Sequence, residues 1–297
     1  MKKTLVIYVT SLLLFGLNGI VAAAIPLPSS QIVALRTFIG AVFIIGVSMR
    51  TTRAVRYKLS HRERVMIVAS GICTGLSWVT LYEAYRLAGV GVSSLLYYCA
   101  PIAVMIASVP LFGEHFTVQK LIGFIVVVCG TLLVSLQSIT VSGDSAGIVL
   151  AAISALCHAG MVIFSKMAPN VSGLQSTQIQ LEVSCAIAIV FMLLSENAVP
   201  LAEIPLDAWP AILLLGLANT GLGCLMYFDS IPKLPAQSVA TLGYLEPLSA
   251  VVFSAVLLGE RMTMLQWFGA AMIIGGALSS EVSIPLLKRR HSNRLGG

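Results

Sequence analysis

The sequence predicts an all-α integral membrane protein with ten transmembrane helices, built from two inverted five-helix repeats. Three observations predict this fold. First, 58% of the 297 residues are hydrophobic and only 10% are charged, with a mean hydropathy of +0.95, whereas a soluble domain carries roughly 25% charged residues. Second, the apolar residues form ten runs of membrane-spanning length. Third, the chain matches itself at an offset of 146 residues.

Each predicted span is a run of mostly apolar residues near the ~20 that a bilayer-crossing helix needs. The runs are continuous and rich in Leu, Ile, Val and Ala, which favours helices over the alternating strands of outer-membrane barrels. Together they occupy about two thirds of the chain, which leaves short loops and excludes a separate soluble domain. In order, the predicted spans cover residues 4–24, 31–49, 65–86, 92–112, 119–137, 145–166, 176–194, 209–228, 236–258 and 264–285.

Basic residues predict the orientation of these spans, because cytoplasmic loops carry an excess of Lys and Arg. With both termini in the cytoplasm, Arg86 and Arg261 fall outside, Arg36 falls within a span, and the other 15 of the 18 basic residues fall inside. We therefore expect a multi-pass protein of the inner membrane with both termini cytoplasmic. The net charge of +6 is explained by this topology, so nucleic acid is not an expected partner. The basic start could also be a signal peptide, but the repeat favours a retained first helix.

An internal repeat relates the two halves of the chain. Residues 98–101 match residues 244–247 in a Tyr and a Pro, and a Gly-Glu-x-x-Thr motif at 113–117 recurs at 259–263. Because each copy holds five spans, an odd number, the second copy crosses the membrane in the opposite sense. We expect a first repeat over residues 1–142, a second repeat over residues 143–285, and a basic cytoplasmic tail over residues 286–297.

Two five-helix copies, each with a proline in its fourth span followed by Gly-Glu-x-x-Thr, resemble the drug/metabolite transporter superfamily and, within it, the EamA-type ten-helix exporters. Residues 234–263 are similar to bacterial amino-acid exporters of that group, including threonine/homoserine exporters. The resemblance covers nearly the whole chain and implies a secondary transporter. That family often carries Trp in its first and sixth spans. This chain has Phe15 and His158 near those positions, so the resemblance implies no aromatic wall there.

Charged residues inside the spans are the first candidates for a binding site, because a charge near the bilayer centre costs at least ~2.5–3.5 kcal/mol and needs a partner or water. Arg36 suits a substrate carboxylate, since a guanidinium binds carboxylates with two parallel hydrogen bonds. Glu246 can accept a substrate ammonium or a coupling proton, form a static ion pair with Arg36, or stay protonated and packed. Glu182 is expected either to share a wet cavity with Arg36 or to find a different partner.

Two prolines and a histidine are candidates for coupling or gating. Pro101 and Pro247 lie near the middle of the fourth and ninth spans, where a proline frees the carbonyl four residues back. We expect a kink at each, which serves packing alone or also shapes a cavity. His158 lies mid-span and is expected either to carry a proton or to be a hydrogen-bonded structural residue.

Oppositely charged residues near span ends form two further candidate gates. Glu83 and Arg86 are three residues apart, and Asp229 and Lys233 are four apart. Both spacings place the two side chains on one helical face. Each pair is expected either to be a solvated surface pair or to open and close with the transport cycle.

Aromatic residues gather in the third, fourth, eighth and ninth predicted spans, with Tyr227 in the eighth. Such residues can form cavity walls that stack on a cation or a ring, although interfacial belts and core packing account for aromatics equally well. The aromatic candidates for substrate binding are Trp78, Tyr82, Tyr97, Tyr98 and Tyr244.

The sequence lacks the motifs that mark several classes of function. It has no P-loop, HExxH zinc motif, GxSxG elbow or dinucleotide-binding fingerprint, so we expect neither an enzyme nor a bound cofactor or metal. The hypothesis is a secondary active transporter that exports small metabolites, amino acids first of all, by alternating access, with proton antiport as an option. Its partners are a small-molecule substrate, protons in the antiport version, and membrane lipid. The alternatives are another cargo (a cationic drug or a nucleotide-like cofactor), import, or a non-transporting membrane scaffold, and the oligomeric state stays open.

Overall fold

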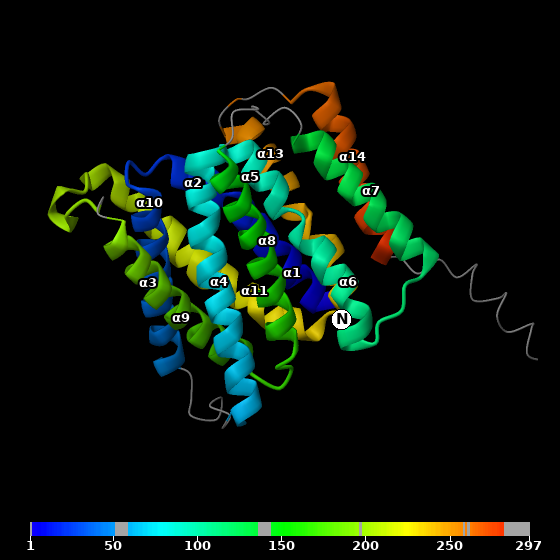
Figure 1. Ribbon diagram of the computed structural model, residues 1–297, viewed down its shortest axis with the longest axis horizontal. Helices are drawn as coiled ribbons and strands as arrows, with labels where there is room; N and C mark the ends of the chain where they lie inside the picture. The colour runs from blue at the N-terminus through cyan, green and yellow to red at the C-terminus, as the bar shows by residue number, and fades with distance from the viewer. Residues whose placement is uncertain are drawn as a thin grey trace, which may run out of the picture.

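The computed structural model describes residues 2–50, 59–135, 144–195, 198–257, 259 and 262–281, and this part of the chain is a bundle of helices (Figure 1). The first span is broken in two and the second and third are continuous, whereas the fourth is broken near its middle. The helices of the first half are α1 (Lys2–Gly16), α2 (Asn18–Ala23), α3 (Ser29–Arg50), α4 (His61–Ala88), α5 (Val90–Tyr97), α6 (Ala100–Phe112) and α7 (Val118–Ser135).

The second half follows the same plan with two differences: its first span is one continuous helix, and its third helix is irregular. That helix, the eighth span, runs over Leu206–Lys233 and contains a π-helical stretch, Leu214–Leu222, which we call the π segment. The helices of this half are α8 (Ser145–Lys166), α9 (Gly173–Leu194), α10 (Trp209–Leu213), α11 (Gly223–Ser230), α12 (Ala236–Gly243), α13 (Leu245–Leu257) and α14 (Met264–Glu281).

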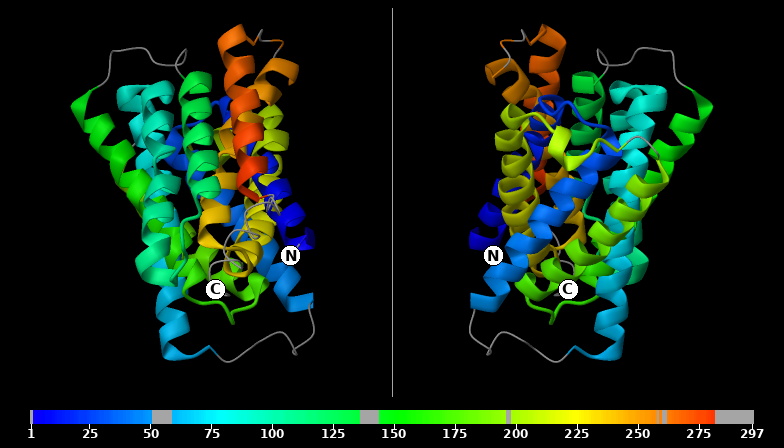
Figure 2. Two further views of the ribbon diagram at one scale, coloured as in Figure 1. Left: turned by 90° about the vertical axis from the view of Figure 1, so that its right-hand side faces the viewer. Right: turned by 90° about the vertical axis from the view of Figure 1, so that its left-hand side faces the viewer.

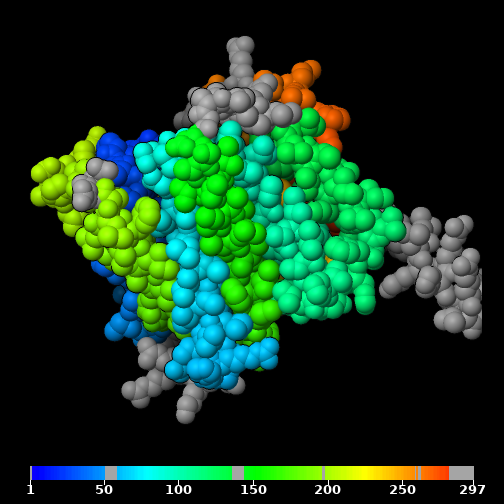
Figure 3. Space-filling model, viewed as in Figure 1, coloured from blue at the N-terminus to red at the C-terminus, as the bar shows by residue number. Residues whose placement is uncertain are grey.

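The predicted transmembrane fold is confirmed. Within the described residues, nine helical runs are long and apolar enough to cross a bilayer, and a shorter apolar helix over Met264–Ser280 provides the tenth. The expected basic tail, residues 286–297, lies outside the described residues. The outer surface remains apolar, as a lipid-facing surface must: Val149 and Leu156 on α8 are 57% and 67% exposed. Figure 3 shows α4 and α8 covering one side of the bundle.

Packing between the helices follows a two-fold pattern in which residue i of the first half is equivalent to residue i + 146 of the second. α4 packs along α8, and the equivalent contact joins α11 of the eighth span to α1. α3 packs against α9 and α7 against α14, so that each of these helices contacts its own equivalent. Figure 1 shows the α7–α14 pair at one end of the bundle and α3 and α9 at the other.

The α7–α14 pair shows that the two repeats are inverted. A Cβ atom on Gly123 would lie 2.7 Å from the carbonyl oxygen of Gly276, and one on Gly130 would lie 2.7 Å from that of Gly269. The residue numbers rise along one helix as they fall along the other, so the equivalent helices are antiparallel. Figure 2 shows this pair side by side from the end of the bundle. Glycine is required at these positions because any side chain would strike the partner's backbone.

Both mid-span prolines interrupt their helices, as predicted. α5 ends at Tyr97 and α6 contains Pro101 in its first turn, while α12 ends at Gly243 and α13 contains Pro247 in its first turn. The breaks are equivalent under the repeat. Each leaves free backbone carbonyls near mid-span, and the Tyr244 hydroxyl donates to the carbonyl oxygen of Tyr98 at 2.9 Å. The fourth and ninth spans therefore meet at their broken centres, at the interface of the two repeats.

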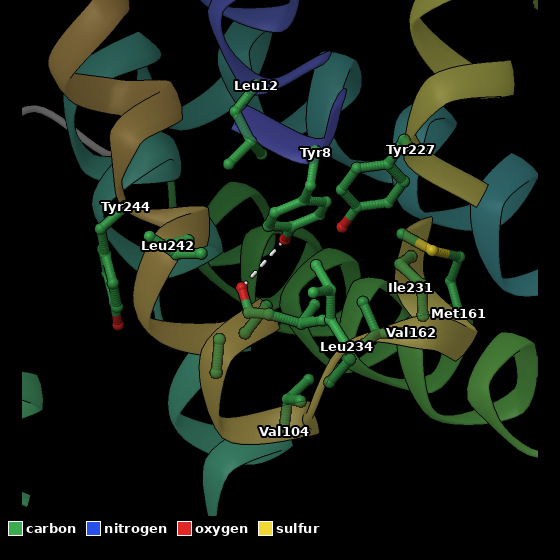
Figure 4. Packing of buried hydrophobic residues seen from close by; sticks show 14 of the residues in the cluster. Tyr8, Leu12, Val104, Met161, Val162, Tyr227, Ile231, Leu234, Leu242 and Tyr244 are labelled. Atoms are coloured by element: carbon green, nitrogen blue, oxygen red, sulfur yellow. Dashed lines mark hydrogen bonds between the residues drawn. The ribbon is translucent and has the colours of Figure 1, made fainter. Parts of the chain in front are cut away.

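The core beside these breaks is formed by residues from both repeats. Tyr8 and Leu12 of α1 are fully buried next to Tyr227 of α11. The Tyr8 hydroxyl donates to the backbone carbonyl of Val239 at 2.9 Å, which joins α1 to α12 (Figure 4). The rings of Tyr8 and Tyr227 stack with centroids 5.4 Å apart. This packed layer closes the bundle on one side of the cavity described next.

Candidate functional site

A cavity of about 380 Å³ lies at the interface of the two repeats. Its walls come from α1 to α5 and α7 in the first half and from α13 and α14 in the second. It extends to the surface at the start of α5, where Val90 and Gly91 line it and Val90 is 61% exposed. Arg36 and Glu246 both line this cavity, so the structure brings together the two charges that sequence reasoning placed first.

The side chain of Arg36 is held firmly from one side. It is 3% exposed, its Nε donates to Thr220 Oγ1 at 2.9 Å, and its Nη1 lies 3.4 Å from the Tyr82 hydroxyl. Its guanidinium carbon lies 4.7 Å from the centre of the Trp78 ring, a cation–π distance. A guanidinium has five N–H donors, so the Nη edge keeps donors for a ligand in the cavity.

Glu246 lies in the first turn of α13, directly after the break in the ninth span. The positive end of a helix dipole favours an anion at this position. Within the described residues its carboxylate makes no ion pair and accepts no hydrogen bond. A static ion pair with Arg36, one of the alternatives from the sequence, is therefore not formed. The cavity instead presents a guanidinium and a carboxyl group that are not paired with each other.

Two cavities of about 30 Å³ each, large enough for water, lie behind the main one. Glu246 and His158 line both of them. The Tyr97 hydroxyl lies 2.7 Å from His158 Nδ1, and Tyr97 also lines the main cavity. His158 therefore does not line the main cavity, but it is connected to it through Tyr97 and shares one small cavity with Arg36 and Trp78.

The aromatic candidates divide between the cavity and the core. Trp78, Tyr82, Tyr97 and Tyr98 line the main cavity. Tyr244 does not: it is 1% exposed and packs edge to face against Phe124. Its hydroxyl donates to the carbonyl oxygen of Tyr98 and so joins the two broken spans. Figure 4 shows the ring of Tyr244 directed away from Tyr8. Of the prolines, Pro247 lines the main cavity and Pro101 one of the small ones.

Glu182 does not line the cavity, so of the two alternatives from the sequence the structure has the one in which Glu182 finds a different partner. It is exposed on α9, and its Oε1 accepts a hydrogen bond from Gln178 Nε2 at 2.9 Å. The buried face of α9 contains Thr177, Gln180 and Ser184, and position 182 falls off this face. This stripe of small polar residues was the signal in the sequence that could have shown it.

The two charge pairs at the span ends form as the spacing predicted. Arg86 bonds to Glu83, and Lys233 Nζ lies 2.6 Å from Asp229 Oδ1. In both pairs the side chains remain partly exposed, and none of the four residues lines the main cavity. They therefore match the description of solvated surface pairs.

Sequence reasoning missed several residues around the cavity. Tyr85, Asn18 and Ser94 line it, and Tyr85 could have been found because it lies three residues after Tyr82 on the same helical face. Thr220, which holds Arg36, gave a weaker signal: the segment 220–222 repeats residues 74–76. The π segment gave no signal that we can identify.

The end of the bundle opposite the cavity mouth is closed by Glu114. Its Oε1 accepts from the backbone N–H of Ala236 at 2.5 Å and its Oε2 from that of Gln237 at 3.0 Å. A residue of the first repeat thus caps α12 of the second repeat. Lys166 adds a bond to the carbonyl oxygen of Leu234. The equivalent residue of the second repeat, Glu260, lies outside the described residues.

Comparison with known proteins gives a consistent result. Residues 2–136 and residues 145–280 each match the EamA-like transporter family. The chain is 26% identical over 280 residues to the uncharacterized transporter YxxF of Bacillus subtilis strain 168, with 93% of this chain and 88% of that protein covered. It is 24% identical over 256 residues to the uncharacterized transporter YvbV of the same strain, with 83% and 80% covered.

A solved crystal structure has the same fold. The match covers 97% of this chain and 99% of the chain in the solved structure. The TM-score is 0.81 and the sequence identity is 19%. Within the described residues no group of three or more His, Cys, Asp or Glu side chains is arranged to hold a metal ion.

Proposed function

We propose that this chain, which belongs to the EamA-like transporter family, is a secondary active membrane transporter that exports small zwitterionic metabolites, with amino acids as the first substrates to test. The observation that carries the proposal is the presence of Arg36 and Glu246 on the wall of one cavity, without an ion pair between them. A ligand with a carboxylate at one end and an ammonium at the other would satisfy both charges. A solute with a single charge would leave the other charge unpaired in a poorly hydrated site.

The cavity has the size and surroundings that a small metabolite needs. Its volume, about 380 Å³, falls in the range of small-molecule pockets. Trp78, Tyr82 and Tyr98 give it an apolar wall with hydroxyl groups, which suits the side chain of an amino acid. An anionic solute such as a nucleotide would call for several bases, and among the described residues that line this cavity Arg36 is the single base.

The inverted repeats support alternating access as the mechanism. Two antiparallel copies of one unit can exchange conformations, which gives two states of similar energy that open to opposite sides. In the structure the cavity reaches the surface beside Val90, and Glu114 closes the opposite end. With both termini in the cytoplasm of a cell with an inner membrane, the open end faces outward. The structure then corresponds to the outward-open state of an exporter that has released its substrate.

Proton antiport is the coupling we propose. Glu246 also lines a small cavity that contains His158 but not Arg36 or Trp78, so its carboxyl group can exchange a proton with water outside the main cavity. An exporter that binds either the substrate ammonium or a proton at Glu246 would release one as it takes up the other. We expect a cytoplasm that is more alkaline than the outside to favour export and to slow uptake into cells.

The test is counterflow in proteoliposomes loaded with each of the twenty L-amino acids, with the purified full chain. We expect labelled amino acid to accumulate for a subset of the panel, and Arg36→Ala to abolish it. We expect Glu246→Gln to exchange amino acids weakly or not at all. Any exchange that remains should not depend on a pH gradient. Glu182→Gln is the matched control, because Glu182 is a span carboxylate outside the cavity.

Ligand-induced stabilisation provides an independent readout, because a solute that binds only the folded protein raises its melting temperature. If the folded protein shows neither counterflow nor stabilisation with any amino acid, the proposal is overturned. Transport of a cationic drug that survives Arg36→Ala would point to the alternative cargo. A protein that moves no solute, while Arg36→Ala alters assembly only, would point to a scaffold.

A further inference from the structure

The π segment lies where the eighth span contacts Arg36. In the first repeat, Thr74 Oγ1 donates to the carbonyl oxygen of Ser70, four residues back, at 2.8 Å. Its equivalent Thr220 donates to the carbonyl oxygen of Leu215, five residues back, at 2.8 Å. The same residue type at equivalent positions therefore has a regular α-helical environment in one repeat and a π-helical one in the other. π-helical turns are rare and occur mostly at functional sites.

The altered register leaves the Thr220 hydroxyl ready to receive Arg36. Its proton is used in the bond to Leu215, so its oxygen can only accept from the arginine Nε, which lies 2.9 Å away. Thr220 is fully buried, so water does not compete for this oxygen. A charge-assisted bond in such a place is stronger than one in solvent.

Close backbone packing fixes the π segment against α3. A Cβ atom on Gly40, one turn after Arg36, would lie 2.9 Å from Thr220 Cγ2, and one on Gly216 would lie 2.6 Å from Ile39 Cγ2. The two helices approach this closely only because both positions are glycine. Thr220 therefore has little freedom to move away from the arginine that it holds.

The three contacts of Arg36 leave its outer edge for the ligand. Thr220 engages Nε, Trp78 stacks on the plane of the group, and Tyr82 makes a long contact to Nη1. No partner for Nη2 is found within the described residues. The Nη1–Nη2 edge can then take a planar group with two oxygens, since a carboxylate matches this fork.

We propose that Thr220 is a positioning residue, which acts through the π segment to aim the free edge of Arg36 at a substrate carboxylate. The inference rests on the proposed function and deepens it: the site recognises the carboxylate of the substrate rather than a general negative charge. A carboxamide, which is uncharged and has one oxygen, is then a poor substitute. The affinity difference between an amino acid and its carboxamide measures how well the arginine is aimed.

The test compares three variants of the full chain in proteoliposomes. Thr220→Val removes the hydroxyl at constant shape, Thr220→Ser keeps the hydroxyl, and Thr74→Val makes the same change at the equivalent position of the other repeat. Each of the twenty L-amino acids and its carboxamide is titrated in counterflow and in thermal stabilisation. For the transported amino acids we expect Thr220→Val to weaken binding about tenfold and the carboxamides to be unaffected. Thr220→Ser and Thr74→Val should resemble the wild type.

The proposal would be overturned in favour of a structural role if Thr220→Val weakened the binding of amino acid and carboxamide by the same factor. It would also be overturned if Thr220→Val and Thr74→Val had equal effects. If Thr220→Val does not fold, Gly40→Ala tests the same contact, because its added methyl group displaces Thr220, and it should reduce the same affinity difference.

A readout without ligand separates this inference from the proposed function. Hydrogen exchange of the Arg36 Nε–H, assigned in ¹⁵N spectra by its loss in Arg36→Lys, should be slow in the wild type and in Thr74→Val and fast in Thr220→Val. If exchange behaves in this way but no amino acid is transported, the proposed function fails and the positioning of Arg36 stands. If exchange is fast in the wild type, the positioning role fails whatever the substrate is.

Discussion

At the scale of single residues, the site depends on the shape of a guanidinium as much as on its charge. Arg36 simultaneously contacts Thr220, Tyr82 and the face of Trp78. A lysine ammonium is compact and cannot reproduce a planar fork with several fixed donors. The positive charge alone would therefore not preserve the site.

We accordingly expect Arg36→Lys to lower the apparent affinity for an amino-acid substrate at least about tenfold, because the two parallel bonds to the carboxylate are lost. Substrate titration of counterflow measures the change. Arg86→Lys is the control, since Arg86 is 63% exposed in its pair with Glu83 and its replacement should leave the affinity unchanged. Full affinity in Arg36→Lys would show that charge alone suffices.

At the scale of helices, equivalent elements of the two repeats differ beside the cavity. The first span is broken at Leu17 between α1 and α2. Asn219 of the π segment bonds across this break, with its Nδ2 3.1 Å from the carbonyl oxygen of Leu14 and 3.0 Å from Asn18 Oδ1. Irregular backbone is thus concentrated beside the cavity, where neighbouring helices can satisfy the freed polar groups.

The cap that Glu114 places on α12 should stabilise the closed end. Loss of a helix cap costs about 1 kcal/mol, so Glu114→Ala should increase the population of molecules open at that end. A cysteine at position 240, which is 2% exposed, should then react faster with a thiol reagent from that side, in a background that lacks the six natural cysteines.

Glu63→Ala is the matched control for this prediction. It also removes a helix cap, because Ser60 and Glu63 bond to each other at the start of α4. This cap lies within the first repeat and does not link the two repeats. It should cost stability without changing the reactivity at position 240. Equal reactivity in the Glu114 and Glu63 variants would mean that the cap is local and takes no part in closing the bundle.

The α7–α14 contact should be the least tolerant of added volume. Gly130→Ala places a methyl group 2.7 Å from a backbone oxygen of Gly269, and overpacking of this kind costs about 1–3 kcal/mol. Gly275→Ala, with no atom within 4 Å of the new Cβ, should be neutral or slightly stabilising because Ala favours helix. Thermal unfolding in detergent compares the two, and equal melting temperatures would contradict the close approach.

At the scale of the whole molecule, the asymmetry between the two ends should be visible in chemical labelling. Ser94 and position 240 are equivalent under the repeat, yet Ser94 lines the open cavity and Ala240 is buried. We expect Ser94→Cys to react with a membrane-impermeant thiol reagent from outside and Ala240→Cys to resist it. A substrate should protect Ser94→Cys. Equal labelling of both positions would contradict an outward-open resting state.

Much of this architecture could be predicted from the sequence, because lipid imposes a strong rule on composition. The ten apolar runs lie within a few residues of the observed helices, and the recurring Pro and Gly-Glu-x-x-Thr revealed the duplication. Arg36 and Glu246 were found because a charge inside a span is expensive and therefore informative.

The remainder of the site depends on rotation and local backbone, which composition does not record. Glu182 lies within a span as Glu246 does, but the rotation of α9 turns it to the outside. Tyr244 and Tyr98 are equivalent by sequence, and only the packing against Phe124 shows that one is core. A π-helical turn changes the register by one residue and leaves no distinct pattern of apolar residues.

The joining of both copies in one polypeptide has a chemical consequence. Arg36 is equivalent to Glu182, and Glu246 is equivalent to Ala100. In a homodimer of a single unit, any charge near the two-fold axis would appear twice, so two guanidinium groups would oppose each other and neither could be answered by a lone carboxylate. Fusion frees each half to diverge. A polar molecule whose two ends differ can then bind in a single orientation. A strictly symmetric homodimer would bind it equally well in two orientations.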